Sequence, residues 1–254
     1  MLTNVRYILL TALRDWLFAV LMIGVLGCAL IAHMLGGTAL IETQEMTLSY
    51  TSASVRVIII AGLITFTCFH IRNAFDTKEI DVFLSRPITR SNLVFSYWLG
   101  FAVVAVLLVL PTVVLLAVQG VINVKGFFFW SASMLIECWL VVAVSLFCAF
   151  TLRSAVTSTI ASMGFYVVAR MMGFFIAMSQ TGYIFGQQSL NTVLIYALKL
   201  LSIIMPRLDS FARSDWLIYG LNNLGELKLY AIQAVILIPL LIFVTIVDFS
   251  RKQF

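Results

Sequence analysis

The 254-residue sequence contains few charged residues and only four prolines. Asp, Glu, Lys and Arg together make up 11% of the chain, whereas a soluble globular domain contains roughly 25%. Hydrophobic residues make up 62%. A chain of this composition cannot cover a water-exposed surface with polar side chains, so we predict an integral membrane protein. No polar stretch is long enough for a second core, which predicts one membrane domain over residues 1–254.

Motifs for ATP hydrolysis and for metal chemistry are also missing from the sequence. The chain contains no Gly-x-x-x-x-Gly-Lys-Ser/Thr string and no His-Glu-x-x-His string. A phosphate-binding loop and a zinc-protease helix are therefore not predicted. Its two histidines, His33 and His70, lie near opposite ends of their predicted spans, which disfavours a shared metal or haem. The four cysteines lie in apolar runs and are interpreted as buried thiols. We expect no catalytic residue, metal or cofactor in this chain.

Six apolar stretches are each long enough to cross about 30 Å of hydrocarbon as a helix. They are residues 16–35, 52–70, 93–118, 127–150, 155–178 and 229–247. The predicted fold class is therefore all-α with six transmembrane helices. Before the first span, Val5, Leu9 and Leu13 repeat at four-residue spacing, with Arg6 and Arg14 able to reach lipid phosphates. This pattern predicts an N-terminal amphipathic helix at the membrane surface.

The region between the fifth and sixth spans contains a further apolar stretch, residues 190–205, which Lys199 interrupts. Its length is marginal for a span, so we favour a re-entrant or interfacial helix over a seventh span. The charged residues that come after it alternate in sign: Arg207, Asp209, Arg213 and Asp215. They are interpreted either as an outer cap or gate or as a solvated loop.

Two charged residues lie deep within the predicted spans. Glu137 is in the fourth span and Arg170 is in the fifth. The two spans are consecutive and antiparallel, and at 1.5 Å per residue the charges lie about 15 Å and 12 Å from the same surface. A lone charge near the bilayer centre costs about 2.5–3.5 kcal/mol and usually has a partner. We therefore predict an intramembrane pair, Glu137 with Arg170, that either holds the two spans together or lines a substrate route.

Residues 72–90, between the second and third spans, concentrate the charged residues of the chain and read RNAFDTKEIDVFLSRPITR. Apolar side chains fall near one face at helical spacing, and acidic side chains fall on the other. Pro87 ends this predicted amphipathic helix, because proline disfavours helical geometry at the residue before it. Thr89 or Ser91 is expected to cap the next helix.

The segment from Phe83 to Arg90, with the sequence FLSRPITR, resembles the LLSRPISR segment of ABC-2 type transporter permeases, which comes after an acidic coupling helix in that family. The chain departs from the family at Lys78-Glu79, where Gly-Thr is common, and at Ser96-Tyr97, where Gly-Lys is common. With six spans around the segment, the resemblance extends over nearly the whole chain. It implies the membrane subunit of an ABC exporter.

The resemblance also implies partners and a site. ATP and Mg would be held by separate ABC ATPase subunits, and a second permease copy would complete a homodimer or a related heterodimer. The residues implied to couple to the ATPase are Arg72, Asp76, Lys78, Glu79, Asp81, Phe83, Arg86, Pro87 and Arg90. Two alternatives are a non-transporting assembly or anchoring subunit and a membrane enzyme that uses carboxylates such as Glu137.

The distribution of positive residues predicts the orientation. With the N-terminus inside, nine Lys and Arg residues lie on the inner face and six, including Arg56, on the outer face. Four of those six lie in the long segment between the fifth and sixth spans, where charges count less. Both termini are therefore predicted to be cytoplasmic, in a bacterial plasma membrane. The net charge of +5 is explained by this bias and does not indicate a nucleic-acid partner.

Overall fold

The computed structural model describes residues 2–14, 16–37, 42–80, 89–180, 205–220 and 224–251. Every regular element in these ranges is a helix, and six helices are long and apolar enough to cross a membrane. They are α2 (Trp16–Gly36), α3 (Thr43–Asp76), α5 (Arg90–Val118), α6 (Val124–Thr151), α7 (Ala155–Gln180) and α10 (Leu224–Arg251). The prediction of an all-α protein with six membrane-length helices is confirmed.

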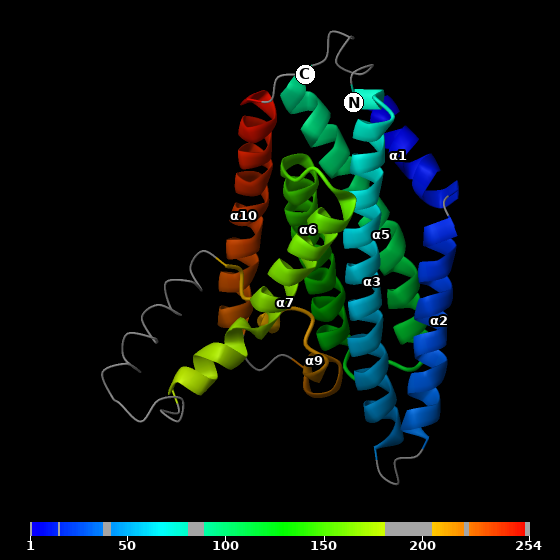
Figure 1. Cartoon of the computed structure of the whole chain (residues 1–254). Helices are drawn as coiled ribbons and strands as arrows, with labels where there is room; N and C mark the ends of the chain where they lie inside the picture. The colour runs from blue at the N-terminus through cyan, green and yellow to red at the C-terminus, as the bar shows by residue number, and fades with distance from the viewer. Residues whose placement is uncertain are drawn as a thin grey trace.

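The two ends of the chain lie at the same end of the helix bundle (Figure 1). We call this the terminal end. The last turn of α3 and the first turn of α5 also lie there, as does the short helix α1 (Leu2–Arg14), which packs against α5. Ile8 and Ala12 form the buried face of α1, whereas Tyr7, Leu10 and Leu13 are exposed. The helix is therefore buried on one side only, but the buried face is not centred on the predicted stripe, because Leu13 is exposed and Val5 and Leu9 are only partly buried.

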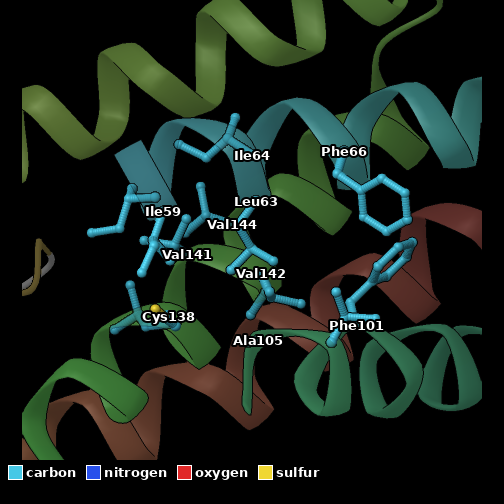
Figure 2. Close-up of a cluster of buried hydrophobic side chains, with 14 of the residues drawn as sticks. Ile59, Leu63, Ile64, Phe66, Phe101, Ala105, Cys138, Val141, Val142 and Val144 are labelled. Carbon is cyan, nitrogen blue, oxygen red and sulfur yellow. The ribbon is translucent and has the colours of Figure 1, made fainter. Parts of the chain in front are cut away.

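Helix α6 lies at the centre of the bundle, in contact with α3, α5, α7 and α10. Six consecutive residues of α6, Val141 to Leu146, are buried, as expected for a helix that is apolar on all sides. Figure 2 shows how Val141, Val142 and Val144 pack between side chains from α3, such as Leu63, and from α5, such as Phe101. The core of the protein is therefore the α3–α5–α6 contact.

Helix α3 is much longer than the predicted span 52–70, because it begins at Thr43 and ends at Asp76. Its first turns are rich in Ser and Thr and come before the predicted span. In the structure these hydroxyls donate to carbonyls of their own helix, for example from Thr47 to Thr43 and from Thr51 to Thr47. Such local bonds satisfy the hydroxyl groups and allow a polar sequence to be buried as helix.

Candidate functional site

A buried ionic cluster lies where α3, α6 and α7 meet, and it consists of Arg56, Glu137, Tyr166 and Arg170. The Glu137 side chain is fully buried, with Oε1 3.5 Å from Nη1 of Arg170 and Oε2 3.9 Å from Nε of Arg56. Tyr166 donates from its hydroxyl to Oε1 at 3.1 Å. The structure thus brings Glu137 and Arg170 together, and it adds a second arginine.

Arg56 corrects the sequence interpretation, which placed it on the outer face at the start of a short span. It lies 13 positions after Thr43, the first residue of α3, and its residue surface is only 4% exposed. Glu137 is likewise 13 positions after the first residue of α6, and Arg170 is ten positions before the last residue of α7. At 1.5 Å per residue, the three charges lie about 15–20 Å from the same end of the bundle. They therefore meet at one level.

The ionic cluster carries one more positive than negative charge. Nε and Nη2 of Arg56 and Oε2 of Glu137 are buried and have no hydrogen-bond partner among the described residues. A buried charge without hydrogen bonds is destabilising, and removing its partner costs more than forming the pair gains. Glu137 is consequently the residue on which the burial of Arg56 depends, whereas Arg170 is about one-quarter exposed at the side chain.

The segment 205–220 packs against the ionic cluster from the end of the bundle opposite the termini. It contains a 3₁₀ turn, η1 (Leu208–Ser210), and the five-residue helix α9 (Asp215–Tyr219). Arg170 donates from Nη1 to the carbonyls of Leu208 and of Phe211, the latter at 3.0 Å. Leu208 and Phe211 are both almost completely buried. One arginine therefore connects the cluster to this segment.

Two serines in the spans also hold the 205–220 segment. Ser133 on α6 accepts the backbone N–H of Ala212 at 3.0 Å, and Ser52 on α3 donates to the hydroxyl of Ser214 at 3.0 Å. Ala212 has a φ of 44°, a backbone conformation that a residue with a β-carbon adopts rarely. Polar contacts thus hold the segment against α3, α6 and α7, and the sequence of the segment does not predict them.

The alternating charges of this segment form two short-range pairs. Arg207 lies 3.3 Å from Asp209, and both side chains are about one-quarter exposed. Arg213 lies 3.1 Å from Asp215, and both of these are more than half exposed. Asp209 also packs so closely on α7 that its carboxylate occupies the space beside Gly173. The first pair therefore belongs to the packing against α7, and the second lies at the surface.

The beginning of the 72–90 stretch is the last turn of α3 and not part of a separate helix, which corrects the sequence interpretation. Arg72 and Asp76 both lie in α3, 3.8 Å apart in an ion pair, and a turn comes next at Thr77 and Lys78. Arg72 donates to the carbonyl of Leu152 at the end of α6 at 3.2 Å. The helix continues because no proline or glycine interrupts it before Asp76.

Arg90, at the other end of the stretch, also bonds to backbone. Its Nη1 donates to the carbonyls of Phe249 and Ser250 in the last turn of α10 at 3.1 and 3.0 Å. Phe249 and Ser250 lie near the C-terminal end of α10, where a cation is favourable because the helix dipole is negative there. Thr89 is the N-cap of α5, with its hydroxyl accepting from the N–H of Asn92. Of the two predicted caps, Thr89 is therefore the one used.

The remaining residues of the stretch differ in their surroundings. Asp76 and Lys78 are exposed, with Lys78 in a left-handed conformation at φ 58°. Glu79 is half-buried and accepts from the hydroxyl of Tyr7 on α1, at 3.4 and 3.5 Å to its two oxygens. Four of the predicted coupling residues lie outside the described residues: Asp81, Phe83, Arg86 and Pro87. The predicted helix over residues 190–205 also lies outside them except for Met205.

Sequence reasoning missed Arg56 and Tyr166 as members of the cluster. Arg56 comes directly before the apolar run that starts at Val57. This position indicates the end of a span only if the Ser- and Thr-rich residues before it are not helical. If they are helical, the same position indicates a charge inside a longer helix. Tyr166 lies four positions before Arg170 and therefore on the same face of α7. That spacing alone could have indicated it.

Comparison of the chain with models of known protein families and with curated proteins finds no match. What the chain itself offers toward a function is therefore the ionic cluster, the 205–220 segment that packs on it, and the charged residues at the terminal end. Among the described residues, no three His, Cys, Asp or Glu side chains come together as they would to hold a metal ion.

Proposed function

We propose that this chain is the membrane-spanning permease subunit of an ATP-driven ABC exporter of the ABC-2 type. The observation that carries the proposal is the 72–90 stretch, whose sequence resembles the coupling region of that family. In the structure, both flanks of this stretch lie at the terminal end of a six-helix bundle, beside the two ends of the chain. A soluble partner could reach all of these segments from one side.

The orientation in this proposal places the terminal end in the cytoplasm of a bacterial cell and the bundle in its plasma membrane. Because Arg56 is buried in α3, it is not counted among the positive residues of the outer loops. The predicted bias is then nine positive residues on the inner side against five on the outer side. This difference supports the orientation with both termini inside.

In this proposal, the exposed end of α3 and the residues after it contact a separate ATPase, on which ATP and Mg are held. Asp76 and Lys78 supply exposed charges for that contact. Arg72 and Arg90 have a different role from the one the resemblance implies, because they bond the chain's own carbonyls. They would fix α3 to α6 and α5 to α10, so that closure of two ATPase subunits moves whole helices. Two permease copies would complete the transporter.

The opposite end of the bundle supplies a candidate gate. The 205–220 segment is buried against α3, α6 and α7, and its contact with Arg170 joins it to the ionic cluster. A substrate leaving by this end has to pass beside the segment or displace it. A membrane enzyme using Glu137 is less well supported, because this carboxylate is fully buried and paired with two arginines.

The test is reconstitution with a separate ABC ATPase. The purified chain and the ATPase are placed in liposomes, and ATP hydrolysis and uptake of candidate compounds are measured together. We expect a stable complex, a raised ATPase rate and ATP-dependent transport. A complex that forms without transport would instead support the non-transporting assembly subunit, and failure to bind any ABC ATPase would overturn the proposal.

A further inference from the structure

A cavity of about 290 Å³ lies at the terminal end between α1 and the last turns of α3. This volume is close to the lower end of the range for small-molecule sites, about 300–1,000 Å³. Its lining combines aromatic rings with polar groups. The aromatic rings belong to Tyr7, Phe66, Phe69 and His70, and the polar groups include Asn73 and Glu79.

The acidic side of this cavity is formed by Glu79. Among the described residues, its two oxygens share one hydrogen-bond donor, the hydroxyl of Tyr7, at 3.5 and 3.4 Å. An ionised carboxylate offers about four acceptor positions, so this carboxylate can accept further bonds from a ligand. Asn73 adds a side-chain carbonyl to the same wall. The wall is thus suited to a group with several N–H donors.

The other side of the cavity is aromatic. The ring of His70 lies 5.6 Å from that of Phe66 and 6.5 Å from that of Tyr7, measured between centroids. Phe69 completes this wall and is 47% exposed. Aromatic faces attract cations, and a carboxylate beside them strengthens the preference. The cavity therefore favours an ammonium group over an anion.

A second hollow, of about 510 Å³, continues from the first along α1 and shares Tyr7 and Thr11 with it. Its other lining residues are Leu10 and Arg14. These four residues are spaced i, i+3, i+4 and i+7, so they form one stripe along one face of the helix. The two hollows together form one groove, with a carboxylate at one end and a guanidinium at the other.

The groove ends at the level where the membrane begins. Arg14 is in the last turn of α1, and Trp16, which starts the membrane-length helix α2, is 84% exposed. Tryptophan at the end of a span marks the interface with the lipid headgroups. Glu79 is bonded to Tyr7, two helical turns or about 10 Å further along α1. The positive end of the groove is therefore the end nearer the hydrocarbon.

We propose that this groove binds the headgroup of a zwitterionic phospholipid that carries a primary amine. In such a lipid the phosphate is next to the glycerol and the ammonium is further out, which is the order of Arg14 and Glu79. The phosphate bonds to Arg14, and the ammonium donates to Glu79 and Asn73 against the aromatic wall. A primary ammonium is preferred to a quaternary one, because only the former has N–H donors for these acceptors.

The test measures lipid binding by the purified full chain in detergent and needs no partner. Native mass spectrometry compares phosphatidylethanolamine, phosphatidylcholine and phosphatidylglycerol with identical acyl chains. We expect the ethanolamine lipid to bind about tenfold more tightly than either competitor, as one charge-assisted hydrogen bond would give. Glu79→Gln should remove this preference, and Arg14→Gln should weaken binding of the ethanolamine and choline lipids alike. Glu42→Gln removes an exposed carboxylate at the far end of α3 and should change nothing.

Four results would overturn the proposal. One is equal binding of the three lipids by the wild-type chain, and another is unchanged selectivity in the Glu79→Gln variant while its thermal unfolding stays normal. The third is equally tight binding of free phosphoethanolamine, which would make the ligand a soluble amine and not a lipid. The fourth is equal binding of the choline and ethanolamine lipids. It would show that a primary ammonium is not required and that the aromatic wall alone accounts for binding of the cation.

Discussion

The backbone carbonyl of Trp216 in α9 occupies the space that a β-carbon on Gly126 of α6 would need. Both groups belong to helix backbones, so neither can rotate out of the way. A β-carbon on Gly220, at the end of α9, would lie 2.7 Å from the side-chain nitrogen of Asn123, which caps α6. Glycine at position 126 is therefore what allows α9 to lie directly on the first turn of α6.

Gly126→Ala is predicted to displace α9 from α6. Overpacking at a site that cannot yield typically costs about 1–3 kcal/mol. We expect a lower thermal unfolding temperature in detergent and faster trypsin cleavage after Arg213, which lies in the exposed part of the segment. Gly164→Ala on α7 is the matched control, because among the described residues nothing beyond its own stretch of helix lies within 4 Å of the new β-carbon. It should be neutral or stabilising by up to about 1 kcal/mol. Equal behaviour of the two variants would contradict the close contact.

Glu137→Gln is predicted to destabilise the protein more than Arg170→Gln does, because the first change leaves both the buried Arg56 and the partly exposed Arg170 without a counter-charge. Breaking a buried pair in this way costs about 3–5 kcal/mol. The double variant should cost clearly less than the sum of the single ones. Unfolding in detergent measures all three. Asp215→Asn, in the exposed pair with Arg213, is the control and should stay within about 0.5 kcal/mol of the wild type. Strictly additive losses would mean that the pair is not coupled.

Arg90→Ala is predicted to loosen the end of α10 from α5. The variant loses two bonds from a charged donor to the carbonyls of Phe249 and Ser250. Bonds to charged groups contribute about 1.5–3 kcal/mol each. We expect faster hydrogen exchange in the last turn of α10 and a lower unfolding temperature. Arg153→Ala removes an exposed arginine at the same end of the bundle and should leave both unchanged. Normal exchange in the Arg90 variant would show that other contacts hold α10.

Reversal of Asp76 and Asp81 to lysine is predicted to uncouple ATP hydrolysis from transport while the chain still inserts. Asp76 is 73% exposed at the side chain, and its only described ion pair is with Arg72, so the reversal at Asp76 alters a surface charge with little effect on packing. Like charges placed across an interface oppose association. The measurement is ATPase turnover and transport in reconstituted liposomes. Glu42 and Glu45, at the opposite end of α3, provide the control reversal. Normal turnover in the test variant would place the ATPase contact elsewhere.

The six spans and the level of Glu137 and Arg170 could be predicted from the sequence, because both depend on chain length and on the cost of charge in hydrocarbon. The extra turns of α3 could not. Thr47, Thr51 and Ser52 are polar in sequence, yet each bonds a carbonyl one turn earlier and becomes buried. The predicted span started only at residue 52, so Thr47 and Thr51 were left out of the helix and Arg56, near the predicted outer end, was not recognised as an intramembrane charge.

The packing of the 205–220 segment was also beyond sequence reasoning. Its holding contacts come from Ser133, Ser52 and Arg170, which lie far away along the chain. The charged residues that the sequence analysis interpreted as a cap or gate, such as Arg213 and Asp215, pair with each other. Alternating sign in a sequence reports local neighbours, whereas backbone groups that accept a distant arginine leave no pattern.

The unbroken length of α3 has a mechanical consequence. Arg72 at the terminal end and Arg56 beside Glu137 are 16 positions apart on one helix, about 24 Å at 1.5 Å per residue. A helix with no proline between them transmits displacement along its axis and does not absorb it in a bend. A tilt of only about 5° about the Arg72 end moves Arg56 sideways by roughly 2 Å over that length. That displacement is about half of the 3.9 Å that separates Nε of Arg56 from Oε2 of Glu137, so a small tilt of α3 at the terminal end changes the spacing of the charges in the ionic cluster.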